Sequence, residues 1–243
     1  MAAHAGGLTS TPAVRVRDLH RSFSANGGVL NGLDLDIAAG EFVALIGRSG
    51  TGKSTLLRAL AGLDRDVKGS GRIAVPDSVS VVFQDSRLLP WKRILGNVTF
   101  GLRGGDADRR GRQALAEVGL AGREQAWPYQ LSGGEQQRAA LARSLVREPR
   151  LLLADEPFGA LDALTRIRMH TLLRKLCEAH RPAVLLVTHD VDEAIVLADR
   201  VILLDGGVVR TDVPVDLPDR SRNSPAFADL RAHLLDQLGV EAS

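Results

Sequence analysis

A chain of 243 residues can bury one substantial core and is too short for two independent ones. Its 31 basic and 29 acidic side chains leave a net charge of +2, which gives no reason to expect nucleic-acid binding. The single cysteine, Cys177, excludes a disulfide or a cysteine zinc site within one chain, and we interpret it as a small buried side chain on a helix. Apolar runs stay below the roughly 18 residues that cross a bilayer, and the start of the chain lacks an apolar signal core. We therefore expect a cytosolic protein that reaches a membrane only through partners.

The first part of the chain predicts a tail, a small antiparallel sheet, and a buried strand followed by a helix. Residues 1–12 are small and polar and are expected to form a loose tail. Alternating apolar and polar residues at 14–17 and 33–37 are typical of strands with one buried face. The unbroken apolar run 42–46 indicates a parallel strand covered on both faces, and a helix is expected over 53–61.

The remainder alternates buried strands with helices. Apolar runs predict further strands at 79–83, 151–154 and 183–187, and a hairpin at 201–209. Helical spacing with Gly and Pro breaks predicts an inserted α-helical subdomain over 88–147, a short helix at 192–198 and a final helix at 226–238. The sequence therefore predicts one α/β domain over 13–235, followed by a tail at 236–243. We expect a mainly parallel core sheet, a small N-terminal antiparallel β-subdomain and the helical insertion.

A phosphate-binding loop is predicted between the buried run 42–46 and the helix after it. The pattern is carried by Gly47, Arg48, Ser49, Gly50, Thr51, Gly52, Lys53, Ser54 and Thr55. Glycines let the backbone curl so that N–H groups point at phosphate oxygens, and the helix N-terminus adds its dipole. Lys53 would reach the β- and γ-phosphates of a nucleoside triphosphate, and Ser54 would hold Mg²⁺. The alternative, a glycine-rich turn that matches by chance, is disfavoured by the strand–loop–helix context.

Two carboxylates, Asp155 and Glu156, end the apolar run 151–154. At the end of a buried strand beside the predicted phosphate loop, Asp155 suits Mg²⁺ binding, directly or through water. Glu156 suits the orientation and deprotonation of an attacking water. A surface acidic pair is the alternative interpretation, and the upstream loop disfavours it.

A second phosphate site is indicated where a serine-capped helix begins, at Ser132, Gly133, Gly134 and Glu135. One chain that hydrolyses one nucleotide has no need of two such sites. We infer that each chain supplies its second site to the nucleotide of a partner chain. The alternative is an ordinary well-capped helix.

Together these segments resemble the ABC ATPase family over about residues 13–235. The stretch Leu131–Gln136 matches the signature that is specific to this family among phosphate-loop ATPases. Four more residues match family elements in the family's order: Phe23, Gln84, Asp162 and His189. The resemblance implies that Phe23 stacks on adenine, where the family usually has Tyr, although a simple core role is the alternative. It implies that Gln84 touches Mg²⁺ and water, that Asp162 lies in the loop linking two active sites, and that His189 contacts the γ-phosphate.

The resemblance implies an active ATPase with the P-loop NTPase fold. Lys53, Gln84, Glu156 and His189 would act on ATP, and Ser54, Gln84 and Asp155 would bind Mg²⁺. Two copies of the chain would sandwich two ATP molecules, with the loop of one copy facing the signature of the other. The helical subdomain would carry the motion to two transmembrane permease subunits, which work with a solute-binding protein. We therefore expect a peripheral location on the cytoplasmic face of the cell membrane, with residues 86–91 lining the groove for a permease helix.

A finer resemblance is to the ATPases of importers for sulfonates, taurine and nitrate, carried by 83–91 and 155–166. Within that group, Trp127-Pro128 and 213–218 look most like the aliphatic-sulfonate importers, with taurine or nitrate as alternative cargoes. The segment 64–84 is short for the family. A soluble ABC ATPase of translation or DNA repair is the alternative class. Those proteins usually carry two ATPase halves, a long coiled coil or cysteine zinc sites, and the sequence has none of these.

Overall fold

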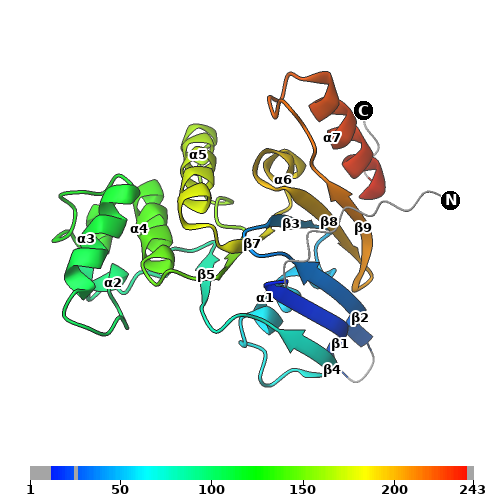
Figure 1. Ribbon diagram of the computed structural model, residues 1–243, viewed down its shortest axis with the longest axis horizontal. Helices are drawn as coiled ribbons and strands as arrows, with labels where there is room; N and C mark the ends of the chain where they lie inside the picture. The colour runs from blue at the N-terminus through cyan, green and yellow to red at the C-terminus, as the bar shows by residue number, and fades with distance from the viewer. Residues whose placement is uncertain (1–11, 25–26, 240–243) are drawn as a thin grey trace.

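The structure, a computed structural model, describes residues 12–24 and 27–239. It forms two β-sheets with helices around them, and a group of helices extends to one side (Figure 1). The predicted tail 1–12 lies outside the described residues except for Pro12, and so does the stretch 240–243 of the predicted C-terminal tail.

The larger sheet has six strands in the order β5-β6-β7-β3-β8-β9. Neighbouring strands are parallel except β8 and β9, which form an antiparallel hairpin. The strands are β3 (Phe42–Ile46), β5 (Val79–Phe83), β6 (Leu151–Asp155), β7 (Ala183–Val187), β8 (Arg200–Asp205) and β9 (Val208–Pro214). The predicted mainly parallel core sheet and the predicted hairpin are confirmed.

The smaller sheet is antiparallel, with strands in the order β2-β1-β4: β1 (Val14–Ser24), β2 (Gly27–Ile37) and β4 (Lys68–Ala74). The sequence predicted β1 and β2 but not β4. Almost every residue of β4 is exposed, so the strand shows no apolar alternation. Gly71 is required where β4 crosses a bulge in β1, because a Cβ there would lie 2.4 Å from the carbonyl oxygen of Asp18.

Four helices flank the larger sheet, and three more form the predicted insertion between β5 and β6. The flanking helices are α1 (Lys53–Leu60), α5 (Ala163–His180), α6 (Val191–Leu197) and α7 (Pro225–Gln237). The insertion contains α2 (Ile94–Val98), α3 (Ala107–Glu117), the 3₁₀ turn η1 (Pro128–Gln130) and α4 (Gly133–Leu145). Helix α7 continues beyond residue 235, where the sequence suggested the domain would end. No helix within 12–24 and 27–239 is both long enough and apolar enough to cross a bilayer.

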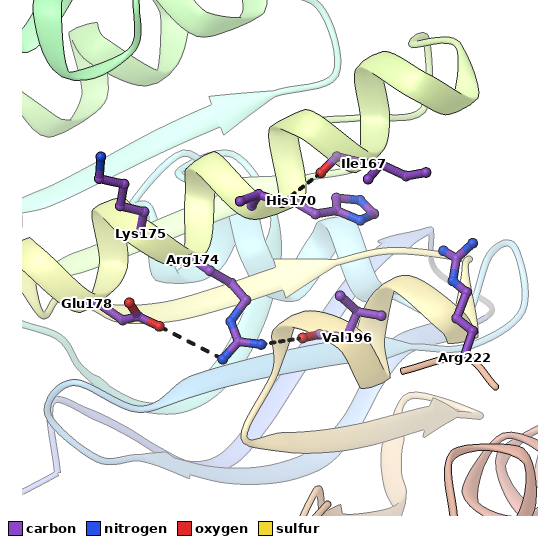
Figure 2. Close-up of a pocket in the computed structure, with 8 residues that line it drawn as sticks. Ile167, His170, Arg174, Lys175, Glu178, Val196 and Arg222 are labelled. Carbon is purple, nitrogen blue, oxygen red and sulfur yellow. Dashed lines mark hydrogen bonds and ion pairs between the residues drawn. The ribbon is translucent and has the colours of Figure 1, made fainter. Parts of the chain in front are cut away.

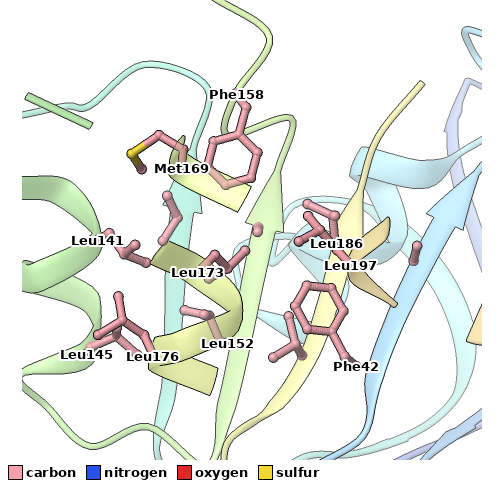
Figure 3. Packing of buried hydrophobic residues seen from close by; sticks show 14 of the residues in the cluster. Phe42, Leu141, Leu145, Leu152, Phe158, Met169, Leu173, Leu176, Leu186 and Leu197 are labelled. Carbon is pink, nitrogen blue, oxygen red and sulfur yellow. The ribbon is translucent and has the colours of Figure 1, made fainter. Parts of the chain in front are cut away.

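The two faces of the larger sheet enter separate hydrophobic cores. In β3, Phe42, Ala44 and Ile46 join the core that also contains side chains of α4 to α7. Figure 3 shows Phe42 near Leu197 of α6, and Leu152 of β6 near Leu173 of α5, within this core. Val43 and Leu45 point the other way, into the core shared with α1 and the smaller sheet. Burial on both faces explains why β3 is an unbroken apolar run.

Candidate functional site

Adjacent parallel strands of the larger sheet end at one edge, and predicted site residues follow each of them. The register aligns Phe83, Asp155 and Val187 across β5, β6 and β7. Directly after these positions come Gln84, Glu156 and, two residues beyond Val187, His189. The loop 47–52 follows β3, which pairs with β7. Ligands bind outside the carboxyl ends of such strands, so this edge is the candidate site.

The loop between β3 and α1 is held closely by its neighbours on two sides. Gly47 has φ 156°, and a Cβ there would lie 2.4 Å from the carbonyl oxygen of Leu204 in β8. Gly52 has φ 102°, and a Cβ there would lie 2.8 Å from the carbonyl oxygen of Val29 in β2. Side chains at these two positions are therefore excluded, and the path of the loop is fixed.

Lys53, the first residue of α1, is buried beneath this loop. Its Nζ donates hydrogen bonds to the carbonyl oxygens of Gly47 at 2.7 Å and Arg48 at 2.8 Å. Burial lowers the pKa of the Lys53 ammonium, and the charges of Glu156 and Asp155 oppose that shift. The loop thus surrounds the Lys53 ammonium, which supplies positive charge for the binding of an anion there.

Ser54 and Asp155 lie together beside Lys53. The Ser54 hydroxyl donates to Oδ1 of Asp155 at 3.1 Å. Burial, and then the charge of Glu156, raises the pKa of the Asp155 carboxyl, while the Ser54 hydrogen bond opposes this shift.

The donor set fits Mg²⁺. A hydroxyl and a carboxylate, both oxygen donors, suit a cation that keeps several waters and takes its other ligands from substrate phosphates. Within the described residues no three His, Cys, Asp or Glu side chains gather into a dedicated metal cage. Gln84 is exposed, and its Nε2 lies 3.3 Å from where a Cβ on Gly159 would stand, so its side chain lies beside the turn that follows Glu156.

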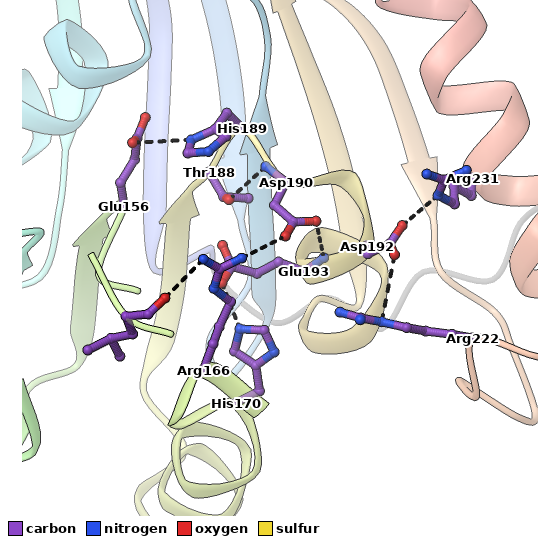
Figure 4. A network of polar contacts seen from close by, with 11 residues as sticks. Glu156, Arg166, His170, Thr188, His189, Asp190, Asp192, Glu193, Arg222 and Arg231 are labelled. Atoms are coloured by element: carbon purple, nitrogen blue, oxygen red, sulfur yellow. Dashed lines mark hydrogen bonds and ion pairs between the residues drawn. The ribbon is translucent and has the colours of Figure 1, made fainter. Parts of the chain in front are cut away.

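Glu156 and His189 face each other across the ends of β6 and β7 (Figure 4). His189 Nδ1 lies 3.2 Å from Oε2 of Glu156, and the His189 side chain is largely exposed. Glu156 has φ 45°, an unfavourable value for a residue with a side chain. Its N–H donates to the carbonyl oxygen of Val187 at 2.9 Å, which holds the backbone in this conformation. Backbone strain of this kind is concentrated at functional positions.

The predicted second phosphate site opens α4, away from the first. Ser132 caps the helix: its Oγ accepts from the N–H of Glu135 at 3.3 Å, and Oε2 of Glu135 accepts from the N–H of Ser132 at 2.9 Å. Backbone hydrogen bonding lowers the pKa of the Glu135 carboxyl. Helix α4 lies on the opposite side of β5 from α1 (Figure 1), so one chain does not bring Ser132 and Gly133 to its own Lys53.

The two remaining predicted residues are both exposed. Phe23 is 60% exposed near the end of β1, so the structure does not support a core role. It follows the pair Ser22–Gly28 in the register of β1 and β2, and β2 carries the Val29 that contacts Gly52. Asp162 caps α5 by accepting from the N–H of Thr165 at 3.0 Å, and this hydrogen bonding lowers the pKa of its carboxyl.

Polar residues behind His189 were not among the predicted site residues (Figure 4). Asp190 caps α6, accepting from the N–H of Glu193 at 3.1 Å. Arg166 lies 3.6 Å from Asp190 and donates to the carbonyl oxygen of Leu161 at 3.2 Å, so it joins the segment before Asp162 to the segment after His189. The spacing of Asp190 and Glu193 is that of a helix cap and could have been found. No local pattern points to Arg166.

A separate groove of about 530 Å³ lies between α5 and α6 (Figure 2). It is lined by Ile167, His170, Arg174, Val196 and neighbouring side chains, and it contains none of the predicted site residues. A much smaller hollow of about 20 Å³ includes Glu156 and His189. We place the candidate site at the strand ends beside this hollow, because Lys53, Asp155 and Glu156 converge there and not in the groove.

Residues 30–159 match the family model described as ABC transporter. Curated relatives align along almost the whole chain. A protein of Rhizobium johnstonii named "Aliphatic sulfonates import ATP-binding protein SsuB 2" is 66% identical over 243 residues, covering 99% of this chain and 97% of the relative. A protein of the same name from Streptomyces avermitilis is 67% identical over 241 residues, covering 99% and 96%.

Solved structures share the fold. A dimeric ATP-binding cassette, MJ0796, in a post-hydrolysis state with ADP and phosphate, superposes with a TM-score of 0.73 at 31% identity, covering 84% of this chain and 99% of that one. The protein cbiO1 of Clostridium perfringens, part of the cbiONQ complex, has a TM-score of 0.78 at 24% identity, covering 95% of each chain.

Proposed function

This chain belongs to the ABC transporter family, and from that premise we propose that it is the ATP-hydrolysing subunit of an importer for aliphatic sulfonates. The names of relatives that are 59–68% identical support this cargo. The observation that carries the catalytic part is the convergence of Lys53, Asp155 and Glu156 at one edge of the sheet.

Nucleotide binding is assigned to the loop 47–55 and to Phe23. Lys53 and the N–H groups at the start of α1 would hold the β- and γ-phosphates, and Lys53 would exchange its carbonyl contacts for phosphate oxygens. The exposed ring of Phe23 would stack on adenine.

Mg²⁺ would be held by Ser54 and Asp155, with Gln84 reaching it from β5. When bound, the ion would neutralise charge on the phosphates. Ser54 and Asp155 are already 3.1 Å apart. Burial raises the pKa of the Asp155 carboxyl, and a bound dication would oppose that shift by favouring the ionised form.

Hydrolysis is assigned to Glu156 and His189. Glu156 would orient an attacking water and accept its proton, because a carboxylate beyond the γ-phosphate can act as a general base. His189, which is within hydrogen-bonding distance of Glu156, would contact the γ-phosphate and thus relate the position of the carboxylate to the presence of that phosphate.

A second copy of the chain would complete each site. Ser132 and the first N–H groups of α4 form an exposed, capped helix N-terminus that could meet phosphate only on another chain. The dimeric cassette MJ0796, whose post-hydrolysis structure is a dimer bound to ADP and phosphate, supports this arrangement. Binding energy of the nucleotide would then hold two copies together.

The membrane partners would be two permease subunits, served by a solute-binding protein, at the cytoplasmic face of the cell membrane. Trp91 is 70% exposed in the segment 86–91 and fits contact with a partner. That segment is tied to α4: Arg143 donates to the carbonyl oxygens of Ser86 and Arg87, each at 2.7 Å, and Gln137 donates to that of Phe83 at 2.9 Å. Movement of α4 would therefore be transmitted to the docking segment.

The phosphate-loop assignment is tested by Lys53→Ala. We expect loss of ATP binding in equilibrium titration and loss of ATPase activity. Lys175→Ala, which removes an exposed lysine on α5, is the matched control and should bind ATP normally. Normal ATP hydrolysis by Lys53→Ala would refute the assignment.

The composite site is tested by Glu156→Gln, which should bind ATP without hydrolysing it. We expect a stable dimer on gel filtration with ATP and a monomer for Glu156→Gln combined with Lys53→Ala. Persistent monomer at saturating ATP would contradict the shared site.

The cargo is tested by deleting the gene and supplying a single source of sulfur or nitrogen. Loss of growth on an alkanesulfonate, restored by the wild-type gene, is the expected result. Loss of growth on taurine or nitrate alone would replace the proposed cargo with that compound.

A further inference from the structure

The side chain of Arg48 leaves the phosphate-binding loop and binds the end of the C-terminal helix α7. Its Nε donates to the carbonyl oxygen of Leu238 at 2.9 Å, and its Nη2 donates to that of Gly239 at 3.4 Å. The last carbonyl groups of a helix have no partners within the helix and carry partial negative charge, so a guanidinium is favoured there. The contact is close, because a Cβ on Gly239 would lie 2.4 Å from Nη2 of Arg48.

Helix α7 is itself firmly attached to the core of the domain. Phe227 and Leu234 are buried in the core shared with α6. Arg231 donates to Asp192 of α6 at 2.7 Å, as Figure 4 shows, and α6 begins directly after the segment that carries His189. The helix therefore connects the fixed core to the phosphate loop at one end and to the helix behind His189 along its side.

We propose that the C-terminal end of α7 positions the phosphate-binding loop through Arg48, which is thus a positioning residue for ATP binding. The N–H groups of the loop point together at the phosphates only if the loop backbone is held in place. A loop that its ligand must first order binds that ligand more weakly. Gly47 and Gly52 are fixed by contacts with β8 and β2, and the exposed middle of the loop, 48–50, has Arg48 as its anchor to α7. This inference rests on the nucleotide site proposed above.

Two variants separate positioning from simple charge attraction. Arg48→Ala removes both the contact and a positive charge near the phosphates. Gly239→Val keeps that charge but displaces Arg48 from α7, since φ at Gly239 is 68° and the added carbons occupy the place of Nη2. Arg210→Ala is the matched control, because Arg210 lines the same hollow as Arg48 and pairs with Asp205 at 2.7 Å.

The readouts are the Kd for ATP with Mg²⁺, the ATPase KM and kcat, and hydrogen exchange of the amides 47–52 without nucleotide. We expect Arg48→Ala and Gly239→Val each to weaken ATP binding and raise KM roughly three- to tenfold, the size expected for a cation at a helix C-terminus. The value of kcat should change less than twofold, exchange at 47–52 should quicken, and Arg210→Ala should match the wild type. The double variant Arg48→Ala with Gly239→Val should be no weaker than Arg48→Ala alone, since both remove one contact.

An unchanged Kd in Gly239→Val beside a weakened Kd in Arg48→Ala would overturn the proposal and leave charge attraction as the role of Arg48. Unchanged binding in both variants, or additive losses in the double variant, would also overturn it. Failure of the wild-type chain to bind ATP would instead refute the proposed function, and with it the inference. Melting temperatures measured alongside distinguish positioning from unfolding. Positioning predicts weaker ATP binding and faster exchange of the amides 47–52, with the melting temperature unchanged.

Discussion

Removing one partner of the buried pair His170–Glu193 is expected to destabilise the protein strongly, whereas replacing both partners is not. Nε2 of His170 in α5 lies 2.7 Å from Oε1 of Glu193 in α6, and each side chain is only 5% exposed. The ring of His170 also meets Phe158 edge-on, with centroids 5.2 Å apart. The pair thus joins the helix after Asp162 to the helix after His189.

The magnitude follows from burial. Removing one member of a buried pair leaves a polar or charged group without its partner, at a cost of about 3–5 kcal/mol. For a domain of this size, each kcal/mol lowers the melting temperature by about 2–4 °C, so Glu193→Ala or His170→Ala should lower it by about 6–20 °C. The double change His170→Leu with Glu193→Met removes both polar groups and fills the space, so its stability should lie within about 1.5 kcal/mol of the wild type.

Urea unfolding and calorimetry of the wild type, the two single variants and the double variant form the assay. The control is the more exposed pair His180–Glu117, with Nε2 and Oε2 2.9 Å apart, where Glu117→Ala should cost less than about 1 kcal/mol. If each single change at His170 or Glu193 cost under about 1 kcal/mol, or if the double change cost the sum of the two, the reasoning from burial would be refuted.

Three further predictions concern single side chains. Asp155→Asn should abolish ATPase activity but raise thermal stability near neutral pH without nucleotide, because burial raises the pKa of the Asp155 carboxyl and folding of the ionised form is penalised. As the pH falls below this raised pKa, the carboxyl is protonated in the folded state, and the stability advantage of Asn should shrink. Melting temperatures that show the opposite trend would contradict the interpretation. Cys177, half-buried in α5, should resist alkylation near neutral pH in the folded protein and react after unfolding, because burial raises the pKa of its thiol to about 12. Rapid labelling of the folded protein in a mass-spectrometric assay would disprove this. Phe23→Ala should weaken ATP binding roughly five- to a hundredfold, the range for one lost base-stacking contact, while Phe23→Tyr should bind ATP as the wild type does. Equal titration curves for Phe23→Ala and the wild type would rule out stacking.

The centre of the core sheet could be predicted from the sequence because β3, β6 and β7 are buried on both faces. Unbroken apolar runs located these three strands to within a residue, and β5, an edge strand interrupted by Ser80, was located by its remaining apolar residues. Strand β4 could not be found in this way, since it is stabilised by pairing with β1 and almost all its side chains are exposed. Its glycines are explained only by the strand that crosses beside them.

The candidate site likewise contains residues that local sequence patterns predict and residues that they do not. Loop glycines and strand-end carboxylates carry their chemistry in local patterns, so the sequence predicts the loop 47–55, Asp155 and Glu156 as site residues. The contacts of Arg166 with Asp190, and of Arg48 with α7, join segments that are separated in the chain. Arginine is common in this sequence and its partners here are mainly backbone carbonyl groups, which carry no sequence signal.

The insertion of the helical subdomain between β5 and β6 has a consequence for how the chain folds. These strands are parallel neighbours, yet about 70 residues, 84–150, separate them. Closing such a loop from the unfolded chain costs about 2 kcal/mol more than closing one of about five residues. We therefore expect β5 to join the sheet late in refolding. Helices α2, α3 and α4 would first pack against one another and thereby bring β5 close to β6. Substitutions of Leu115 in α3 and Leu141 in α4, both buried, should then slow refolding in proportion to the stability they remove, and leave the rate of unfolding nearly unchanged.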